Sequence, residues 1–376
     1  MTTYVRAKCH CQQNVFKIPF RTDSLPIPNN LCHCNACRHS TGQLAGYHVR
    51  FEGMPLSITT EADEPADLEN LTKYQTSIKA ARYFCSTCSA HMFWQSIGDA
   101  GKDRQYWEVA VGLLEQVDGI VKVKGHIYVG ETLDGGMADH FISAGDKVLA
   151  RYAQGEGGEQ LPVGWRAVLK KASKEGQQSE EWIQAYCHCR TVSFIITRPN
   201  SQSSIPSCPY PDLLVPGTEE NTAKAQNPTD RKWWLRPTGA SKPKKYLAGY
   251  CACASCRLTS GAEVLAWVFM PRANIIDTKT NEPIQLEDEN HRPKGLKQYI
   301  SSHGRYREFC STCGAIAFRW KIDRTGLLDV AAGLFDQEQG GARADGWFDW
   351  IRDRIGFSED AIGNETIIGL IEVITK

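Results

Sequence analysis

The sequence predicts a mainly β protein of two tandem domains, each an antiparallel β-sheet domain stapled by zinc. Three observations lead to this prediction: one order of cysteine clusters occurs twice, short β-branched and aromatic runs surround those clusters, and stretches with helical periodicity are scarce. We expect the first domain at residues 1–150, a linker rich in Gly, Lys, Glu and Gln at 151–181, and the second domain at 182–376. The second domain carries an insertion at about 199–245.

Fourteen of the fifteen cysteines belong to the repeated order. In the first half the clusters are Cys9 and Cys11, then Cys32, Cys34 and Cys37, then Cys85 and Cys88. In the second half they are Cys187 and Cys189, then Cys251, Cys253 and Cys256, then Cys310 and Cys313. The remaining cysteine, Cys208, lies in the insertion and is interpreted as an ordinary thiol. The repeat indicates two copies of one domain.

Strands are predicted where apolar residues alternate or form short β-branched and aromatic runs. Around the clusters these segments are 15–18, 107–113, 194–196 and 264–269. Within the insertion, Trp233 and Trp234 are expected to hold the segment against its domain.

Charge and hydropathy narrow the function classes. The 43 basic residues balance 43 acidic ones, so no long-range field attracts a phosphate backbone and no nucleic-acid partner is expected. No run of about 18 apolar residues occurs, so we expect neither export nor membrane insertion and place the protein in the cytoplasm. In a reducing compartment, clustered cysteine pairs indicate metal binding rather than disulfides, and zinc is the default metal for thiolate sites.

Seven thiols per copy cannot share one tetrahedral ion, so the simplest division is four plus three. We expect the outer pairs of each copy to form a closed, structural quartet that couples metal binding to folding. The three central cysteines form a trio whose fourth position stays open, as in catalytic zinc sites; the alternative is a structural site completed by a histidine or by water. His33 could be that ligand, but the second copy has Ala252 at this place.

An open trio has a characteristic chemistry. Three sulfur anions make its zinc a weak Lewis acid for water and suit it to holding an external thiol as a thiolate, so a small-thiol cosubstrate is expected. Arg38 and Arg257 directly follow the third cysteine of each trio. We interpret them as donors to sulfur or as anchors for a substrate or cofactor carboxylate, with ordinary surface arginines as the alternative.

The motifs Cys-His-Cys, Cys-His-Cys-x-x-Cys-Arg and Cys-Ser-Thr-Cys resemble the glutathione-dependent formaldehyde-activating enzyme family, which includes centromere protein V. The resemblance covers roughly residues 4–142 and 183–355. It implies antiparallel sheets around zinc, a four-cysteine structural zinc, and a three-cysteine zinc that meets the glutathione sulfur in a carbon-sulfur lyase reaction giving S-hydroxymethylglutathione. The second copy departs from the pattern through Ala252, the insertion, and the lack of a His-Ile-Tyr-Val segment after Leu334.

The sequence therefore predicts a zinc enzyme with up to four ions per chain that uses glutathione to add a thiolate to, or remove it from, an electrophilic carbon of a small molecule. The same chemistry permits isomerisation or elimination. Candidate proton-transfer residues are His33, Tyr47, His48 and Glu108, and Asp329 corresponds to Glu108. The alternative function is a non-catalytic, zinc-stabilised protein-interaction module.

Overall fold

The computed structural model describes residues 1–60, 62–98, 105–168, 181–208, 232–237, 240–351, 354–363, 366 and 369–370. Strands dominate this part of the chain. The α-helices α1 (Asn35–Thr41) and α3 (Ala254–Ser260) have seven residues each. The mainly β fold class is thus confirmed. No helix within the described residues has the length and apolar character that crossing a membrane requires.

The first copy is built on a five-stranded antiparallel sheet in the order β4-β8-β7-β6-β5. A two-stranded hairpin and a small sheet in which β3 and β12 each pair in parallel with β9 accompany it. The strands are β1 (Thr2–Lys8), β2 (Val15–Arg21), β3 (Ile27–Cys32), β4 (His48–Arg50), β5 (Leu71–Ser77), β6 (Ala80–Cys85), β7 (His91–Ser96), β8 (Tyr106–Ala110), β9 (Val121–Ile127), β10 (Ser143–Ala144), β11 (Lys147–Val148) and β12 (Ala150–Arg151).

The second copy repeats this order as β17-β22-β21-β20-β19, and its sheet is extended by β16, β15 and β23. Its hairpin, β13 with β14, gains β18 as a third strand. The strands are β13 (Trp182–Tyr186), β14 (Ser193–Thr197), β15 (Leu235–Arg236), β16 (Lys245–Cys251), β17 (Leu265–Pro271), β18 (Ile275–Asp277), β19 (Leu296–Ser302), β20 (Arg305–Cys310), β21 (Ile316–Lys321), β22 (Leu327–Ala331) and β23 (Phe348–Trp350).

Short 3-10 helices connect these strands. They are η1 (Thr22–Ser24), η2 (Val111–Leu113), η3 (Val129–Thr132), η4 (Gly136–Asp139), η5 (Ser201–Ser204), η6 (Arg272–Asn274), η7 (Ile322–Arg324), η8 (Ala332–Leu334), η9 (Gln337–Gln339) and η10 (Ser358–Asp360). The strand expected at 107–113 therefore ends at Ala110, and its last three residues form η2. The reason is tertiary: the N–H of Gly112 turns to the other copy and donates to the Gly261 carbonyl at 3.0 Å.

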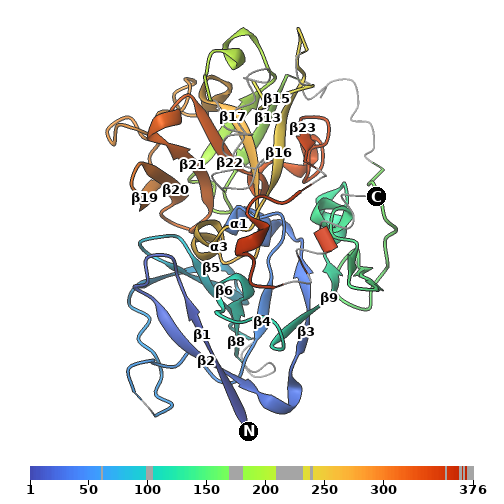
Figure 1. The fold of residues 1–376 in the computed structure, drawn as a ribbon, viewed down its shortest axis with the longest axis vertical. Helices are drawn as coiled ribbons and strands as arrows, with labels where there is room; N and C mark the ends of the chain where they lie inside the picture. Colours follow the sequence, from blue (N-terminus) through green and yellow to red (C-terminus); the bar gives the residue numbers. More distant parts are fainter. Residues whose placement is uncertain are drawn as a thin grey trace.

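The two copies meet in an approximate two-fold arrangement, with α1 and α3 both in the middle of the view in Figure 1, where α1 packs against η8 and α3 against η2 of the opposite copy. Equivalent backbone bonds cross the interface in both directions. They are Gly112 N to Gly261 O (3.0 Å), Gly333 N to Gly42 O (3.0 Å), His10 N to Leu258 O (3.0 Å) and His188 N to His39 O (2.8 Å). The interface is thus isologous within a single chain.

The histidines between the first two cysteines of each copy extend this symmetry. His10 Nδ1 lies 2.7 Å from the hydroxyl of Tyr299, and His188 Nδ1 lies 2.7 Å from the hydroxyl of Tyr74. Each cysteine turn is therefore hydrogen-bonded to β5 or β19 of the opposite copy. Metal binding at the turns and docking of the copies are structurally linked.

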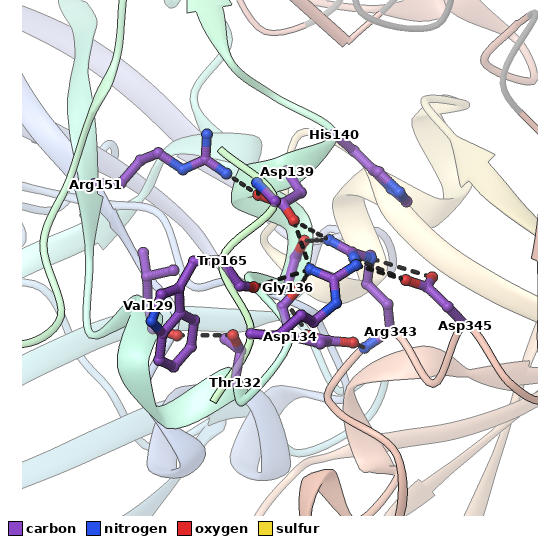
Figure 2. A network of polar contacts seen from close by, with 12 residues as sticks. Val129, Thr132, Asp134, Gly136, Asp139, His140, Arg151, Trp165, Arg343 and Asp345 are labelled. Atoms are coloured by element: carbon purple, nitrogen blue, oxygen red, sulfur yellow. Dashed lines mark hydrogen bonds and ion pairs between the residues drawn. The ribbon is translucent and has the colours of Figure 1, made fainter. Parts of the chain in front are cut away.

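A buried polar network provides a further connection between the copies (Figure 2). The Asp139 carboxylate forms ion pairs with Arg151, with Arg166 at 2.9 Å and with Arg343 at 3.1 Å. Arg343, in the second copy, also donates to the Gly136 carbonyl at 2.8 Å. Because a buried charge without its partner is costly, these contacts fix the segment after β9 against the second copy.

Part of the expected linker packs on the first copy. β12 pairs with β9, and Leu161 and Trp165 contact a small apolar cluster around Val129. Residues 169–180 of that linker lie outside the described residues.

The tryptophan anchor predicted for the insertion is confirmed. Trp233 and Trp234 are 1% and 0% exposed. Their ring nitrogens donate to the carbonyls of Cys208 and Ser203 at 3.1 and 3.0 Å. They therefore attach the described ends of the insertion to the core.

Gly261→Ala is expected to loosen the docking of the copies. Gly261 has φ of +84°, and a Cβ there would lie 2.5 Å from the His91 carbonyl oxygen of the first copy. Gly53 is the matched control, because it has φ of +67° with nothing within 4 Å of a built Cβ. In urea unfolding of the full chain we expect Gly53→Ala to cost about 1 kcal/mol and Gly261→Ala about 2–4 kcal/mol. Equal costs would contradict the interface contact.

Candidate metal centres and functional site

Each quartet joins a hairpin turn to the turn between two strands of the main sheet. Cys9 and Cys11 follow β1, and Cys85 and Cys88 close the tight turn between β6 and β7. The Cys9 and Cys11 sulfurs are 3.4 Å apart, and those of Cys11 and Cys85 are 3.5 Å apart. The second copy forms the equivalent cluster from Cys187, Cys189, Cys310 and Cys313. In both clusters all ligand atoms lie within 4.8 Å of one another.

The donor geometry fits zinc. Four sulfurs at about 2.3 Å from one ion are about 3.8 Å from each other in a tetrahedron, close to the spacings of 3.4 and 3.5 Å found here. None of the fourteen clustered cysteines forms a disulfide, so no disulfide competes for these sulfurs. The division into quartets and trios expected from the sequence is reproduced by the sulfur positions, and all four clusters are suited to hold zinc.

The trios lie at the start of the two α-helices. Cys34 caps α1, and its sulfur accepts the N–H of Cys37 at 3.3 Å, while Cys253 caps α3 in the same way at 3.4 Å. The Cys32 and Cys34 sulfurs are 3.4 Å apart. Hydrogen bonds from Cys32 and Cys34 hold the pKa of the Cys37 thiol well below its usual range, with a contribution from a nearby arginine. The trio is thus prepared to carry negative charge.

That arginine, Arg82 on β6, was missed by sequence reasoning. Its Nη2 donates to Cys37 Sγ at 3.0 Å, and its counterpart Arg307 on β20 donates to Cys256 Sγ at 3.5 Å. Both side chains are buried. A signal was present, because each arginine stands three residues before the Cys-Ser-Thr-Cys pair in both copies.

Arg38 and Arg257 do not reach a trio sulfur through any contact between described residues. Arg38 is 0% exposed and donates to Asn35 and, at 2.9 Å, to Gln337 of the second copy. Arg257 donates to the Gly112 carbonyl of the first copy at 2.7 Å. Both arginines are therefore used at the interface, and their expected part in cofactor binding remains a hypothesis.

His33 is buried and forms a hydrogen-bonded pair of imidazoles with His126. His126 Nε2 donates to the Phe141 carbonyl at 2.7 Å, so its Nδ1 is the acceptor for His33 Nε2 at 2.9 Å. His33 Nδ1 is left buried without a hydrogen-bond partner. Burial holds the pKa of His33 well below its usual value, which keeps the ring neutral.

His48 and Glu108 lie on neighbouring strands beside the trio. Desolvation lowers the pKa of His48 to about 3, whereas desolvation and the Cys37 thiolate raise the pKa of Glu108 to about 7. Glu108 is half-buried and forms no hydrogen bond or ion pair with the described residues. It is the one candidate carboxyl here that can change its protonation state near neutral pH.

A small cavity of about 10 Å³ adjoins these groups. Tyr47, His48 and Gln43 of the first copy line it, and a buried Nε2 of His48 has no hydrogen-bond partner. Gly46 separates it from the trio: a Cβ built there would lie 3.4 Å from Cys37 Sγ. The volume has room for about one water molecule.

Fold and clusters together define a class: a tandem β protein with four thiolate-rich centres suited to zinc. The profile of the glutathione-dependent formaldehyde-activating enzyme family matches residues 4–131 and 238–349, well over half of the chain. The chain belongs to this family, and the two matched segments are consistent with two tandem copies. No curated protein and no solved structure matched the chain.

Arg82→Gln is expected to weaken metal binding at the first trio by about 10–100-fold, because the sulfur loses a charged donor. The measurement is zinc release to a chromogenic chelator, with the two quartets as internal reference. Arg307→Gln is the matched variant and should affect the second trio instead, while Arg82→Lys should restore part of the affinity. Unchanged release from Arg82→Gln would remove the arginine from this role.

Proposed function

We propose that the protein is an enzyme that uses zinc at Cys32, Cys34 and Cys37 to bring glutathione to an electrophilic carbon of a small molecule. The observation that carries this proposal is the trio itself. Among the described residues, no further cysteine, histidine or carboxylate places a ligand atom within 4.8 Å of all three sulfurs. An incomplete ligand set of this kind is typical of catalytic zinc, and family membership supports glutathione as the thiol.

Bound at the trio, zinc would supply a Lewis acid that keeps the glutathione sulfur in its thiolate form. The chain's own contribution is electrostatic. Arg82 donates to Cys37 Sγ at 3.0 Å and offsets part of the negative charge of the three sulfurs. A further thiolate can then approach with less repulsion.

Addition of a thiol to an aldehyde requires proton transfer but no oxidant. The sulfur-carbon bond forms, the carbonyl π electrons move to oxygen, the thiol proton leaves, and the oxygen gains a proton. Glu108, with its pKa raised to about 7, is suited to accept and return that proton. His48 and His33 have lowered pKa values, so they would act as neutral hydrogen-bonding groups.

Carbon-sulfur lyase activity is the form of this chemistry that we favour, and isomerisation or elimination would use the same thiolate addition. The grouping of fourteen cysteines into clusters suited to a metal ion supports a reducing, cytoplasmic location. The competing proposal, an interaction module, differs in requiring a permanently occupied fourth position at the first trio.

Cys34→Ser tests the assignment of the trio. We expect zinc content to fall from about four ions per chain to about three, and glutathione-dependent turnover of a panel of aldehydes and activated alkenes to fall at least about 100-fold. Cys208→Ser, which changes the cysteine outside the clusters, should keep both values. Full turnover in Cys34→Ser with one zinc lost would refute the catalytic assignment.

Glu108→Gln tests the proton-transfer role. Because the base must be deprotonated, wild-type kcat/KM should rise with pH through about 7, and the variant should lose this rise together with about 100-fold or more in rate. The folded state favours the neutral carboxyl, so its stabilisation is present below about pH 4.5 and is lost as the pH rises through about 7.

Glu108→Gln should therefore be more stable than wild type at pH 8, by on the order of 2–3 kcal/mol, and about equally stable at pH 4.5. Exposed Glu52 provides the control variant Glu52→Gln, for which neither effect is expected. A pH profile of Glu108→Gln that keeps the wild-type inflection would exclude Glu108 as the base.

A further inference from the structure

The strand registers give residues around the first trio counterparts in the second copy. His48 pairs with Ala110 across β4 and β8, and Trp267 pairs with Ala331 across β17 and β22. Trp267 is therefore the counterpart of His48. The same comparison makes Asp329 the counterpart of Glu108.

The two environments differ in chemistry. Four histidines at or near the first trio have an alanine, a tryptophan and two isoleucines as their counterparts in the second copy. His33, His48, His91 and His126 correspond to Ala252, Trp267, Ile316 and Ile355. Four neighbours that can hydrogen-bond through imidazole nitrogens are thus replaced, and the only polar atom gained is the indole N–H.

Trp267 closes the second trio. Its side chain is 1% exposed, and its Nε1 donates to Cys256 Sγ at 3.5 Å. Cys251 is 2% exposed, whereas its counterpart Cys32 is half-buried, and Cys256 is 0% exposed against 8% for Cys37. Cys34 and Cys253 are both half-buried. The smaller imidazole at His48 instead leaves the cavity beside the first trio.

Asp329, the counterpart of Glu108, is held in place by ion pairs. Asp329 is 0% exposed and its two oxygens form ion pairs with Arg319 at 2.8 Å and Arg324 at 2.6 Å. In the first copy the position of Arg319 is occupied by Trp94, and Glu108 has no ion pair with a described residue. Both oxygens of this carboxylate are therefore used in ion pairs within the second copy.

The second copy nevertheless takes part in the first site. Ser260, Gly261 and Ala262 line the cavity next to His48 and His91. Ser260 is the last residue of α3 and the other two directly follow it, and the start of α3 carries the second trio. An ordered second trio therefore positions one wall of the first site.

We propose that the two trios have separate roles: the first exchanges its fourth ligand with thiols, and the second is a structural zinc centre, shielded from thiols by Trp267, that holds α3 and the wall of the first site. The first half of this statement rests on the proposed function. The closure of the second trio does not.

Cobalt substitution of the full chain separates the two trios, because thiolate-to-cobalt charge-transfer bands report the number of sulfur ligands. In wild type we expect the spectral change to be complete when one equivalent of glutathione has bound per chain. In Cys34→Ser we expect no glutathione-dependent change, although about three cobalt ions remain bound. Two equivalents in wild type, with one remaining in Cys34→Ser, would overturn the inference while leaving the proposed function intact. One equivalent in wild type that persists in Cys34→Ser would contradict both, because the exchanging site would then not be the first trio. No response in wild type would instead contradict the proposed function and the open state of the first trio.

Trp267→His tests the closure directly, since it places the first copy's residue at the second trio. We expect this variant to respond to two equivalents of glutathione. Trp267→Phe, which keeps a large apolar ring and loses the Nε1 donor, should still respond to one equivalent of glutathione, as wild type does. One equivalent in Trp267→His, with four cobalt ions bound, would show that the indole is not the barrier. A normal quartet spectrum in each variant verifies that the chain has folded.

Discussion

Each copy brings seven sulfurs into two small groups, and their charge has to be neutralised before the chain can pack. Two thiolates 3.4 Å apart repel each other by roughly 5 kcal/mol at an effective dielectric constant near 20. Protonated thiols avoid this repulsion but give up the cross-link that holds the β1–β2 turn against the main sheet. A divalent cation removes both problems, so metal binding and folding form one equilibrium. The histidines inside the turns then carry this order to the opposite copy.

The approximate two-fold arrangement has a consequence for the sites. Two identical chains related by symmetry carry identical sites, and every substitution occurs twice. A single chain with two copies is free of this restriction, so one trio can lose its polar surroundings while the other keeps them. The interface, in contrast, is the same in both copies. Gly112 of the first copy contacts Gly261 of the second, and Gly333 of the second contacts Gly42 of the first.

Much of the fold and of the metal chemistry could be read from the sequence, because cysteine spacing and strand periodicity are local signals. The quartets, the trios and the mainly β class follow from them. The roles of Arg38 and Arg82 could not be read in this way. Position next to Cys37 suggested a sulfur contact for Arg38, but the direction of α1 turns its side chain to Gln337 of the other copy. Arg82 is distant in sequence and reaches Cys37 because β6 lies beside the trio.

Charge alone does not distinguish the two trios. Each has three cysteines and one buried arginine on sulfur, Arg82 or Arg307, and the additional Arg319 of the second copy is paired with Asp329. The remaining differences are space and proton acceptors. Beside the second trio the indole of Trp267 occupies the volume, and Asp329 is held by two arginines. Beside the first trio His48 leaves a cavity, and burial raises the pKa of Glu108 to about 7. Under the proposal of separate roles, access to the metal is the property in which the copies have diverged.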